Sequence, residues 1–535
     1  MNSFDTGVLL RILTLARSGA LDRALRLFHG EGLDDVVDDA AVLSVKGRLL
    51  KDRARLAQGE DRTHLWRESG EAYALAAELS GWPYHLINAA TLSLLGGDAV
   101  LARSKASRVL EVLDSGQDIS ETAYYLFATR AEALLLLGLR DEAEAALRQA
   151  VQLAPSAWED HATTRRQFRL ILSLIGGDDD WLEVLRPPSS LHFAGPMTLI
   201  DTPELRDRVH SLLRATRTGF AFGALAGGSD IIIAEAVLDH GAELEIVLPF
   251  PPDQFRAMSV EPLGGTWAAR FDNILSRSTL HPVQGSTIGA PCLAAVKIAA
   301  EVAMGRAIAH AQSLYDEAFQ LILADETVGA PSGSITRWIE ARWRRSMRPQ
   351  HIVFAASPSD ATVAAGASIA DNGLLPAAVL AIAFDEALLG MGSLTQEVSD
   401  LRDRLERAIG DLFLLTPAIQ VGRTVQVAFA EPDEAAEAAR RISDICGERC
   451  RIGGHYSVAG WRPGLFGARV LTGPATIWPD RLLAAAPAGA AYVSEPFAMA
   501  LRSVSPNVEN HTVYGGDVSD TPEPMEAYRL DLTLR

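Results

Sequence analysis

The sequence predicts three successive parts: an all-helical part, an α/β part built on a doubly wound parallel sheet, and an α+β part. Residues 1–185 place Ala and Leu at helical spacing and contain no convincing alternating strand. From residue 190, apolar strand-like runs alternate with amphipathic helices, which is typical of a parallel sheet covered on both faces. From residue 351, strands and helices follow in mixed order, which predicts an α+β domain.

Length and charge limit the possible functions. A chain of 535 residues is too long for one core, and at roughly 150 residues per domain it suggests three or four domains. The hydrophobic fraction of 48% and the charged fraction of 22% are those of globular domains. The net charge of −19 repels phosphate backbones and anionic lipids, so we expect neither nucleic acid nor a membrane as partner.

The N-terminal residues MNSFDTGVLLRIL carry no basic leader, and we expect no signal peptide. The most apolar window, LLPAAVLAIAFDEALLGMG, is interrupted by Asp385 and Glu386, which are costly in a bilayer. We therefore expect a cytoplasmic protein. Cys446, Cys450 and His455 lie close in sequence but lack a fourth ligand, so ordinary thiols are favoured over a metal site.

The helical part repeats one pattern, a helix ending at Gly with Ala five residues later. The pairs are Gly19 and Ala24, Gly97 and Ala102, and Gly138 and Ala143. Small residues let paired helices approach closely, and Pro155 ends the last helix. Residues 1–185 resemble degenerate tetratricopeptide repeats, with the Gly positions 78 and 41 residues apart. The resemblance implies a concave surface for a protein partner, and a plain helical bundle is the alternative.

The acidic and Pro-rich stretch GGDDDWLEVLRPPSS reads as a boundary, after which an α/β domain spans 190–348. Within it, LAGGSD follows a strand and precedes a helix. Glycines there let a ligand approach the backbone, and free N–H groups and the helix dipole attract negative oxygens. We expect Ser229 to cap the helix and Asp230 to accept hydrogen bonds from ribose hydroxyls. The alternative is an ordinary strand-to-helix turn.

The stretch LAGGSDIIIAEAVLDHGAELEIVLPF resembles the SLOG superfamily, whose Smf-type and LOG-type members share a Gly-Asp turn, a small-residue helix and a strand ending at Pro. The resemblance covers about 190–345, including FRAMSV, Trp267 and Phe271. It implies a Rossmann-like domain that binds a nucleotide-derived ligand. The implied binding residues are Gly223, Gly227, Gly228, Ser229 and Asp230.

A second glycine loop, APSGSITRWIE, adds Gly333 and Ser334 as candidate binding residues. LOG-type enzymes carry a catalytic Glu four residues after the matching Gly, and Arg337 occupies that position here. The resemblance therefore favours ligand binding over nucleotide hydrolysis.

Residues from about 375, within a domain spanning 351–535, resemble class III adenylate and guanylate cyclases. The resemblance rests on AAVLAIAFDE, VGRTVQVAFAEPDEAAEAARR, RIGGHYSV, FGARVLTGPATI, YVSEPFA and AYRL in family order. It implies a ferredoxin-like α+β domain that forms homodimers. An unrelated ferredoxin-like domain is the alternative.

The positions for cyclase chemistry are mostly substituted. Asp385 matches the first carboxylate for Mg²⁺ or Mn²⁺, but Arg423 follows Gly422 where the second belongs, and a cation there repels metal ions. The other departures are Ile419 for the purine-reading Lys, Gly464 for an Asp, Leu471 for the transition-state Asn, and Ala475 or Thr476 for the following Arg. The resemblance thus implies a pseudoenzyme.

Together these features favour a bacterial cytoplasmic signalling protein without catalysis of its own. In this hypothesis the repeats hold a protein partner, the SLOG-like domain senses a nucleotide-derived ligand, and the cyclase homology domain dimerises. Two alternatives remain: an active cyclase that uses Asp385, and a scaffold in which both glycine loops are ordinary turns.

Overall fold

A computed structural model describes residues 6–17, 21–115, 121–283, 291–325, 334–356, 373–384, 396–421, 424–463, 469–504, 512–518 and 525–532. The chain divides into two compact units, Met1–Pro187 and Pro188–Arg535. Each unit is described by itself.

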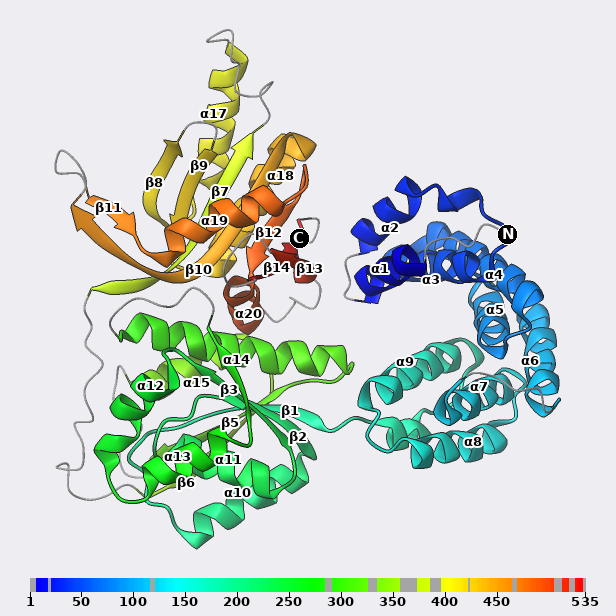
Figure 1. The fold of residues 1–535 in the computed structure, drawn as a ribbon, viewed down its shortest axis with the longest axis horizontal. Helices are drawn as coiled ribbons and strands as arrows, with labels where there is room; N and C mark the ends of the chain where they lie inside the picture. The colour runs from blue at the N-terminus through cyan, green and yellow to red at the C-terminus, as the bar shows by residue number, and fades with distance from the viewer. Residues whose placement is uncertain are drawn as a thin grey trace. The chain divides into compact units, whose positions relative to one another are not determined.

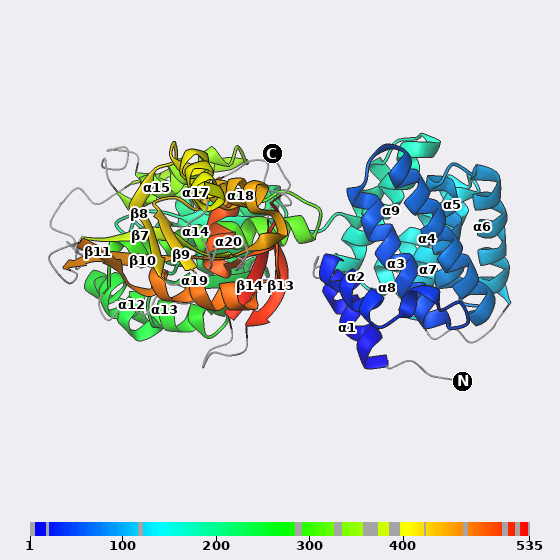
Figure 2. The same cartoon turned by 90° about the horizontal axis from the view of Figure 1, so that it is seen from above.

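In the described residues of the first unit, all regular secondary structure is helical. From α1 to α8, each helix packs on the next, and alternate helices such as α5 and α7 also touch (Figures 1 and 2). Helix α9 packs on α5 and α7. The helices are α1 (Thr6–Arg17), α2 (Leu21–Gly30), α3 (Ala40–Leu56), α4 (Gly59–Ser80), α5 (Pro83–Leu95), α6 (Ala99–Asp114), α7 (Ala123–Leu136), α8 (Arg140–Leu153) and α9 (Trp158–Ile175), with 3-10 turns at Leu33–Asp35 and Asp180–Leu185.

The Gly and Ala pattern acts as predicted at two of its three places. Gly97 and Gly138 follow the ends of α5 and α7 with φ of 92° and 83°, a conformation that favours glycine. Ala102 and Ala143, five residues later, are buried where α6 and α8 pack against their neighbours. Gly19 lies outside the described residues.

The second unit begins with a six-stranded sheet in which every neighbouring pair is parallel. The strand order is β4-β3-β2-β1-β5-β6. The strands are β1 (Ser189–Ala194), β2 (Thr218–Gly223), β3 (Glu243–Leu248), β4 (Thr279–Pro282), β5 (Phe319–Asp325) and β6 (Gln350–Ala355). The helices are α10 (Pro203–Ala215), α11 (Ser229–Asp239), α12 (Pro252–Ser259), α13 (Trp267–Leu275), α14 (Leu293–Ser313) and α15 (Ile335–Arg345), with a 3-10 turn at Glu261–Leu263.

Strand β6 crosses the boundary that the sequence analysis placed between 348 and 351. Its residues pair with β5 from Gln350 to Ala355, so they belong to the first sheet. The strand lies at the edge of the sheet and half of its residues are exposed, whereas β1, β2 and β5 are mostly buried.

The second sheet has the order β13-β14-β12-β10-β7-β9-β8, with β11 added on β10. Its strands are β7 (Leu374–Phe384), β8 (Leu414–Val421), β9 (Thr424–Phe429), β10 (Cys450–Pro463), β11 (Arg469–Thr472), β12 (Ala491–Ser494), β13 (Thr512–Val518) and β14 (Met525–Leu530). All pairings are antiparallel except that of β10 with β12. The helices are α17 (Gln396–Ile409), α18 (Pro432–Cys446), α19 (Pro474–Ala485) and α20 (Glu495–Val504), with a 3-10 turn at Gly447–Arg449.

Helix α14 packs on both sheets of the second unit. It contacts β1, β2 and β3 of the parallel sheet, and β7, β10 and α20 of the antiparallel one (Figure 1). Its backbone approaches that of α20 so closely that a Cβ on Gly305 would lie 2.2 Å from the carbonyl oxygen of Met499. One hydrophobic core therefore contains side chains from both sheets.

A polar network crosses this junction, and all of its members are buried except Glu431, whose side chain is 40% exposed. The hydroxyl of Tyr456 on β10 donates to Glu301 Oε2 of α14 over 2.8 Å. Arg342 of α15 pairs with Glu301 and, over 2.7 Å, with Glu431 at the start of α18. Burial raises the pKa of Glu301 to about 7 despite the opposing effects of Arg342 and Tyr456. Because removing one partner would leave a buried polar group unpaired, loss of these contacts should destabilise the junction.

Candidate ligand site at the glycine turn

The glycine turn connects β2 to α11 and is buried. Gly223 ends β2, and a Cβ there would lie 2.7 Å from the ring of Phe193. Gly228 has a φ of +81°, and a Cβ there would lie 2.3 Å from the carbonyl oxygen of Met197. Glycine is therefore required at both positions by close packing, and at Gly228 also by backbone conformation.

Carbonyl groups of the protein occupy several donors of this turn. The N–H of Gly227 donates to the Ser259 carbonyl over 2.9 Å, and the N–H of Ser229 donates to the Pro196 carbonyl over 3.3 Å. The Ser229 hydroxyl donates to the same carbonyl over 2.6 Å. Ser229 was expected to cap α11, but Gly228 is the N-cap residue, because the loop after β1 brings Pro196 against the Ser229 side chain.

Asp230 is the most unusual group in the turn. Its residue is only 6% exposed, and Oδ2 accepts the Ala226 N–H over 3.1 Å. Among the described residues, Oδ1 has no hydrogen-bond partner. Burial raises the pKa of Asp230 to about 7, although hydrogen bonding from the backbone of Ala226 and of Gly195 opposes this rise. A buried oxygen without a partner is costly, and a ligand hydroxyl would relieve that cost.

The second glycine loop lies only partly within the described residues, and Gly333 falls outside them. Ser334 is the N-cap of α15, and its hydroxyl accepts the Arg337 N–H over 3.3 Å. Arg337 is exposed in the first turn of this helix. At Ser334, the side chain thus serves the helix.

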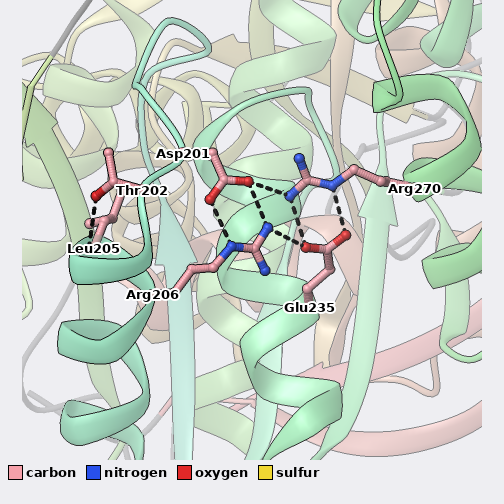
Figure 3. Close-up of polar contacts among 6 residues, drawn as sticks. All are labelled: Asp201, Thr202, Leu205, Arg206, Glu235 and Arg270. Atoms are coloured by element: carbon pink, nitrogen blue, oxygen red, sulfur yellow. Dashed lines mark hydrogen bonds and ion pairs between the residues drawn. The ribbon is translucent and has the colours of Figure 1, made fainter.

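A cluster of four charged side chains, which the sequence analysis did not single out, lies beside α11 (Figure 3). Arg206 of α10 donates to Asp201 through Nε over 2.7 Å and Nη2 over 2.6 Å, and to Glu235 of α11 over 2.9 Å. Arg270 of α13 donates to Glu235 over 2.7 and 2.8 Å and pairs with Asp201 over 3.0 Å. We call these residues the charge clamp.

The charge clamp lowers the pKa of Asp201. Burial alone would raise it, but the hydrogen bonds and charges of Arg206 and Arg270 outweigh that effect. The hydrogen bond to Asp201, in turn, raises the pKa of Arg206. Both charges are therefore maintained at neutral pH.

The loop 195–202 joins the clamp to the glycine turn. At its start, Pro196 and Met197 lie against Ser229 and Gly228, and at its end Asp201 is held by the clamp. Thr202 then caps α10 by accepting the Leu205 N–H over 3.2 Å (Figure 3). One signal was available in the sequence: Glu235 interrupts the otherwise apolar run IIIAEAVL.

The cyclase-like positions that the structure describes hold apolar or small residues. Ile419 is 46% exposed on the edge strand β8, and Leu471 is buried on β11. Ala475 is buried in α19, where the neighbouring Thr476 hydroxyl donates to the Gly473 carbonyl over 2.9 Å. Four further positions lie outside the described residues: Asp385, Gly422, Arg423 and Gly464.

Cys446 and Cys450 are free and buried. His455 is buried on β10, where Nδ1 shares a 2.8 Å hydrogen bond with the Ser494 hydroxyl, and burial lowers its pKa to about 3. Within the described ranges, no group of three or more His, Cys, Asp or Glu side chains is arranged to hold a metal ion. Nor does any helix described in the structure combine the length and apolarity needed to cross a membrane.

Comparison with known proteins finds a family model that matches the first helices. Residues 7–93 match the family model TPR-S, Tetratricopeptide Repeats-Sensor, which supports the tetratricopeptide-like prediction for this segment. The clearest repeat in the sequence, around Gly138, lies beyond the matched residues. No curated protein matches the chain.

Among solved structures, similar chains include guanylate cyclase domains. That of RhGC from Catenaria anguillulae in complex with GTP is 14% identical, with a TM-score of 0.23, over 29% of this chain and 96% of that one. A double mutant of the guanylyl cyclase domain of RhoGC from Blastocladiella emersonii is 15% identical, with a TM-score of 0.22, over 30% of this chain and 96% of that one. TM-scores this low carry no argument about fold or activity.

Proposed function

We propose that this chain is a regulatory protein whose α/β domain binds a nucleotide-derived ligand and passes the bound state to a cyclase homology domain through α14. The observation that carries the proposal is the packing of α14 on both sheets, with the polar network of Glu301, Arg342, Glu431 and Tyr456 at the junction. A rearrangement on one sheet must then be accommodated on the other, because packed cores deform little.

The ligand proposal draws support from the position and chemistry of the glycine turn. In open parallel sheets, ligands bind at the carboxyl ends of strands, near the point where the strand order reverses. In the order β4-β3-β2-β1-β5-β6 this point lies between β1 and β5, and the turn follows β2, which is the other neighbour of β1. Asp230 supplies a buried acceptor there. A SLOG-like nucleotide site agrees with these features.

The assignment of the second sheet rests on its strand order. The succession β7-α17-β8-β9-α18-β10, with the spatial order β10-β7-β9-β8, supports a ferredoxin-like βαββαβ unit. Arg423 and Leu471 at the positions of a metal carboxylate and a transition-state Asn argue for a domain without cyclase chemistry. A homodimer formed through this domain is part of the proposal.

The helical unit is proposed to bind a protein partner. Tyr84 on α5 and Tyr125 on α7 are 36% and 42% exposed, and the Tyr125 hydroxyl donates to Asp160 of α9. Arg48 and Arg55 on α3 are also partly exposed beside Asp52. Tyrosine and arginine are enriched among residues that dominate binding energy at protein interfaces.

The decisive test is to identify small molecules retained by the purified full-length protein by mass spectrometry and to titrate them together with a panel of nucleotides. We expect one nucleotide-derived compound to bind and to raise the melting temperature, by the equivalent of about 2.7 kcal/mol at a hundredfold excess over Kd. Asp230→Asn should weaken its binding at least tenfold, whereas Asp239→Asn at the exposed end of α11 should not. Absence of any binder would refute the sensing role.

Two further readouts test the other parts. Ligand binding should change amide hydrogen exchange in α20 as well as around α11, and an unchanged α20 would contradict transmission through α14. Incubation with ATP or GTP and Mg²⁺ or Mn²⁺ should yield no cyclic nucleotide. Production that disappears in Asp385→Ala would overturn the non-catalytic proposal.

A further inference from the structure

The charge clamp holds Asp201 in the way that an arginine pair holds an external anion. Arg206 grips the Asp201 carboxylate with two parallel hydrogen bonds of 2.7 and 2.6 Å, and Arg270 approaches it within 3.0 Å. Guanidinium groups bind carboxylate and phosphate with the same two-pronged geometry. The carboxylate therefore occupies a position that suits a phosphate group.

Groups other than Asp201 also hold the two guanidinium groups. Glu235 accepts hydrogen bonds from both of them, over 2.9 Å from Arg206 and over 2.7 and 2.8 Å from Arg270. The ring of Trp267 also lies 4.1 Å from the Arg270 guanidinium carbon, which further orients it. An arginine pair held by other groups is prepared to bind an anion.

The local charge and the solvent exposure of the two arginines favour replacement of the Asp201 carboxylate by an anionic ligand. With Asp201 in place, two guanidinium and two carboxylate groups cancel, whereas its departure leaves one net positive charge. The side chains of Arg206 and Arg270 are 33% and 18% exposed, so both are partly open to solvent. Asp201 itself lies on a loop rather than within a helix or strand.

Displacement of Asp201 would also affect the glycine turn. The same loop, 195–202, brings the Pro196 carbonyl onto the N–H and hydroxyl of Ser229 and the Met197 carbonyl against Gly228. Movement of the loop would free these donors for the ligand. A phosphate at the clamp and an open turn are thus two results of one movement.

We propose that Arg206 and Arg270 form a phosphate-binding site which Asp201 occupies as an internal anion, and that a phosphate group of the ligand displaces Asp201 and lifts the loop 195–202 from the glycine turn. This inference rests on the proposed function, since it names the ligand class and the opening step for the same site. Asp201 competes at a high effective concentration, so the unliganded protein remains closed.

The test measures binding of inorganic pyrophosphate to the full-length protein by calorimetry at fixed ionic strength. Asp201→Asn removes the internal anion and keeps the side-chain shape, and we expect at least tenfold tighter binding than in the wild type. Adding Arg270→Gln to that variant should abolish the gain. Asp272→Asn is the matched control, because Asp272 lies on α13 with Arg270 but pairs with Arg256 of α12, outside the clamp. This variant should bind like the wild type.

The outcomes separate this inference from the proposed function. If Asp201→Asn binds pyrophosphate no better than the wild type, or if Asp272→Asn gives the same gain, the clamp is a structural ion-pair network and the inference fails. If a retained nucleotide binds and depends on Asp230 but not on Arg270, only the inference fails. A second measurement uses the wild-type protein and therefore does not depend on whether a variant folds. Pyrophosphate should make the Ser229 amide exchange its hydrogen faster, and an unchanged exchange rate would contradict the movement of the loop.

Discussion

At the scale of single residues, Asp230 combines a structural cost with a candidate function. Its carboxyl group is buried at the start of α11, where Oδ2 accepts the Ala226 N–H and hydrogen bonding from the Gly195 backbone also favours the charged form. The raised pKa of about 7 means that the folded protein favours the protonated carboxyl. Groups with strongly shifted pKa values are common at functional sites.

Asp230→Asn should make the protein more stable at high pH. Because the folded-state pKa exceeds the ordinary value of 3.8, the contribution of this group to stability is complete below that value and declines until the pH passes about 7. Between pH 5 and 8 the wild type should lose about 3 kcal/mol that the variant keeps. Thermal unfolding at both pH values measures the difference. Asp239→Asn should follow the wild type, and equal pH dependence in all three proteins would contradict the assignment.

At the scale of elements, α14 determines how the second unit is assembled. A helix that is apolar around most of its surface must be covered on every side, and its two sides are covered by different sheets. Gly305 allows α14 and α20 to meet backbone to backbone, with Met499 directly opposite. Gln312 of the same helix accepts a hydrogen bond from Arg502 of α20.

Gly305→Ala should destabilise the second unit although alanine is the better helix former. A Cβ would lie 2.2 Å from a backbone oxygen, so α14 and α20 must separate, at a cost of about 1 to 3 kcal/mol. Chemical denaturation of the full-length variant measures this loss. Gly30→Ala, at the end of α2 with no atom within 4 Å of the added Cβ, serves as control and should be neutral or slightly stabilising. A Gly305→Ala variant as stable as the wild type would refute the close helix packing.

At the scale of the whole molecule, the two units differ in how they are built. The helical unit has several local cores shared by neighbouring helices, as expected of repeats. The unit from Pro188 onward has a main core that contains side chains from both sheets. The first should therefore tolerate local opening, and the second should unfold as a whole.

Fragments of the second unit test this difference. A fragment 188–535 should fold and unfold cooperatively, whereas 188–356 alone should aggregate or lack near-ultraviolet circular dichroism, because it exposes the face of α14 that packs on β7, β10 and α20. A fragment 1–187 should fold by itself and provides the control. A stable, monomeric 188–356 fragment would show that the two sheets are independent domains.

The sequence by itself determined the elements and several of their ends, since these depend on nearby residues. The Gly and Ala pattern predicted where α5 and α7 end, and the strand-turn-helix succession predicted the position of Gly228. The tertiary structure alone decided which segments meet. It placed β6 in the first sheet and joined Asp201 to Arg270. It also directed the Ser229 hydroxyl to the Pro196 carbonyl instead of to the N-terminus of α11. Contacts between residues far apart in the chain depend on the path of the whole backbone, and local patterns do not contain that information.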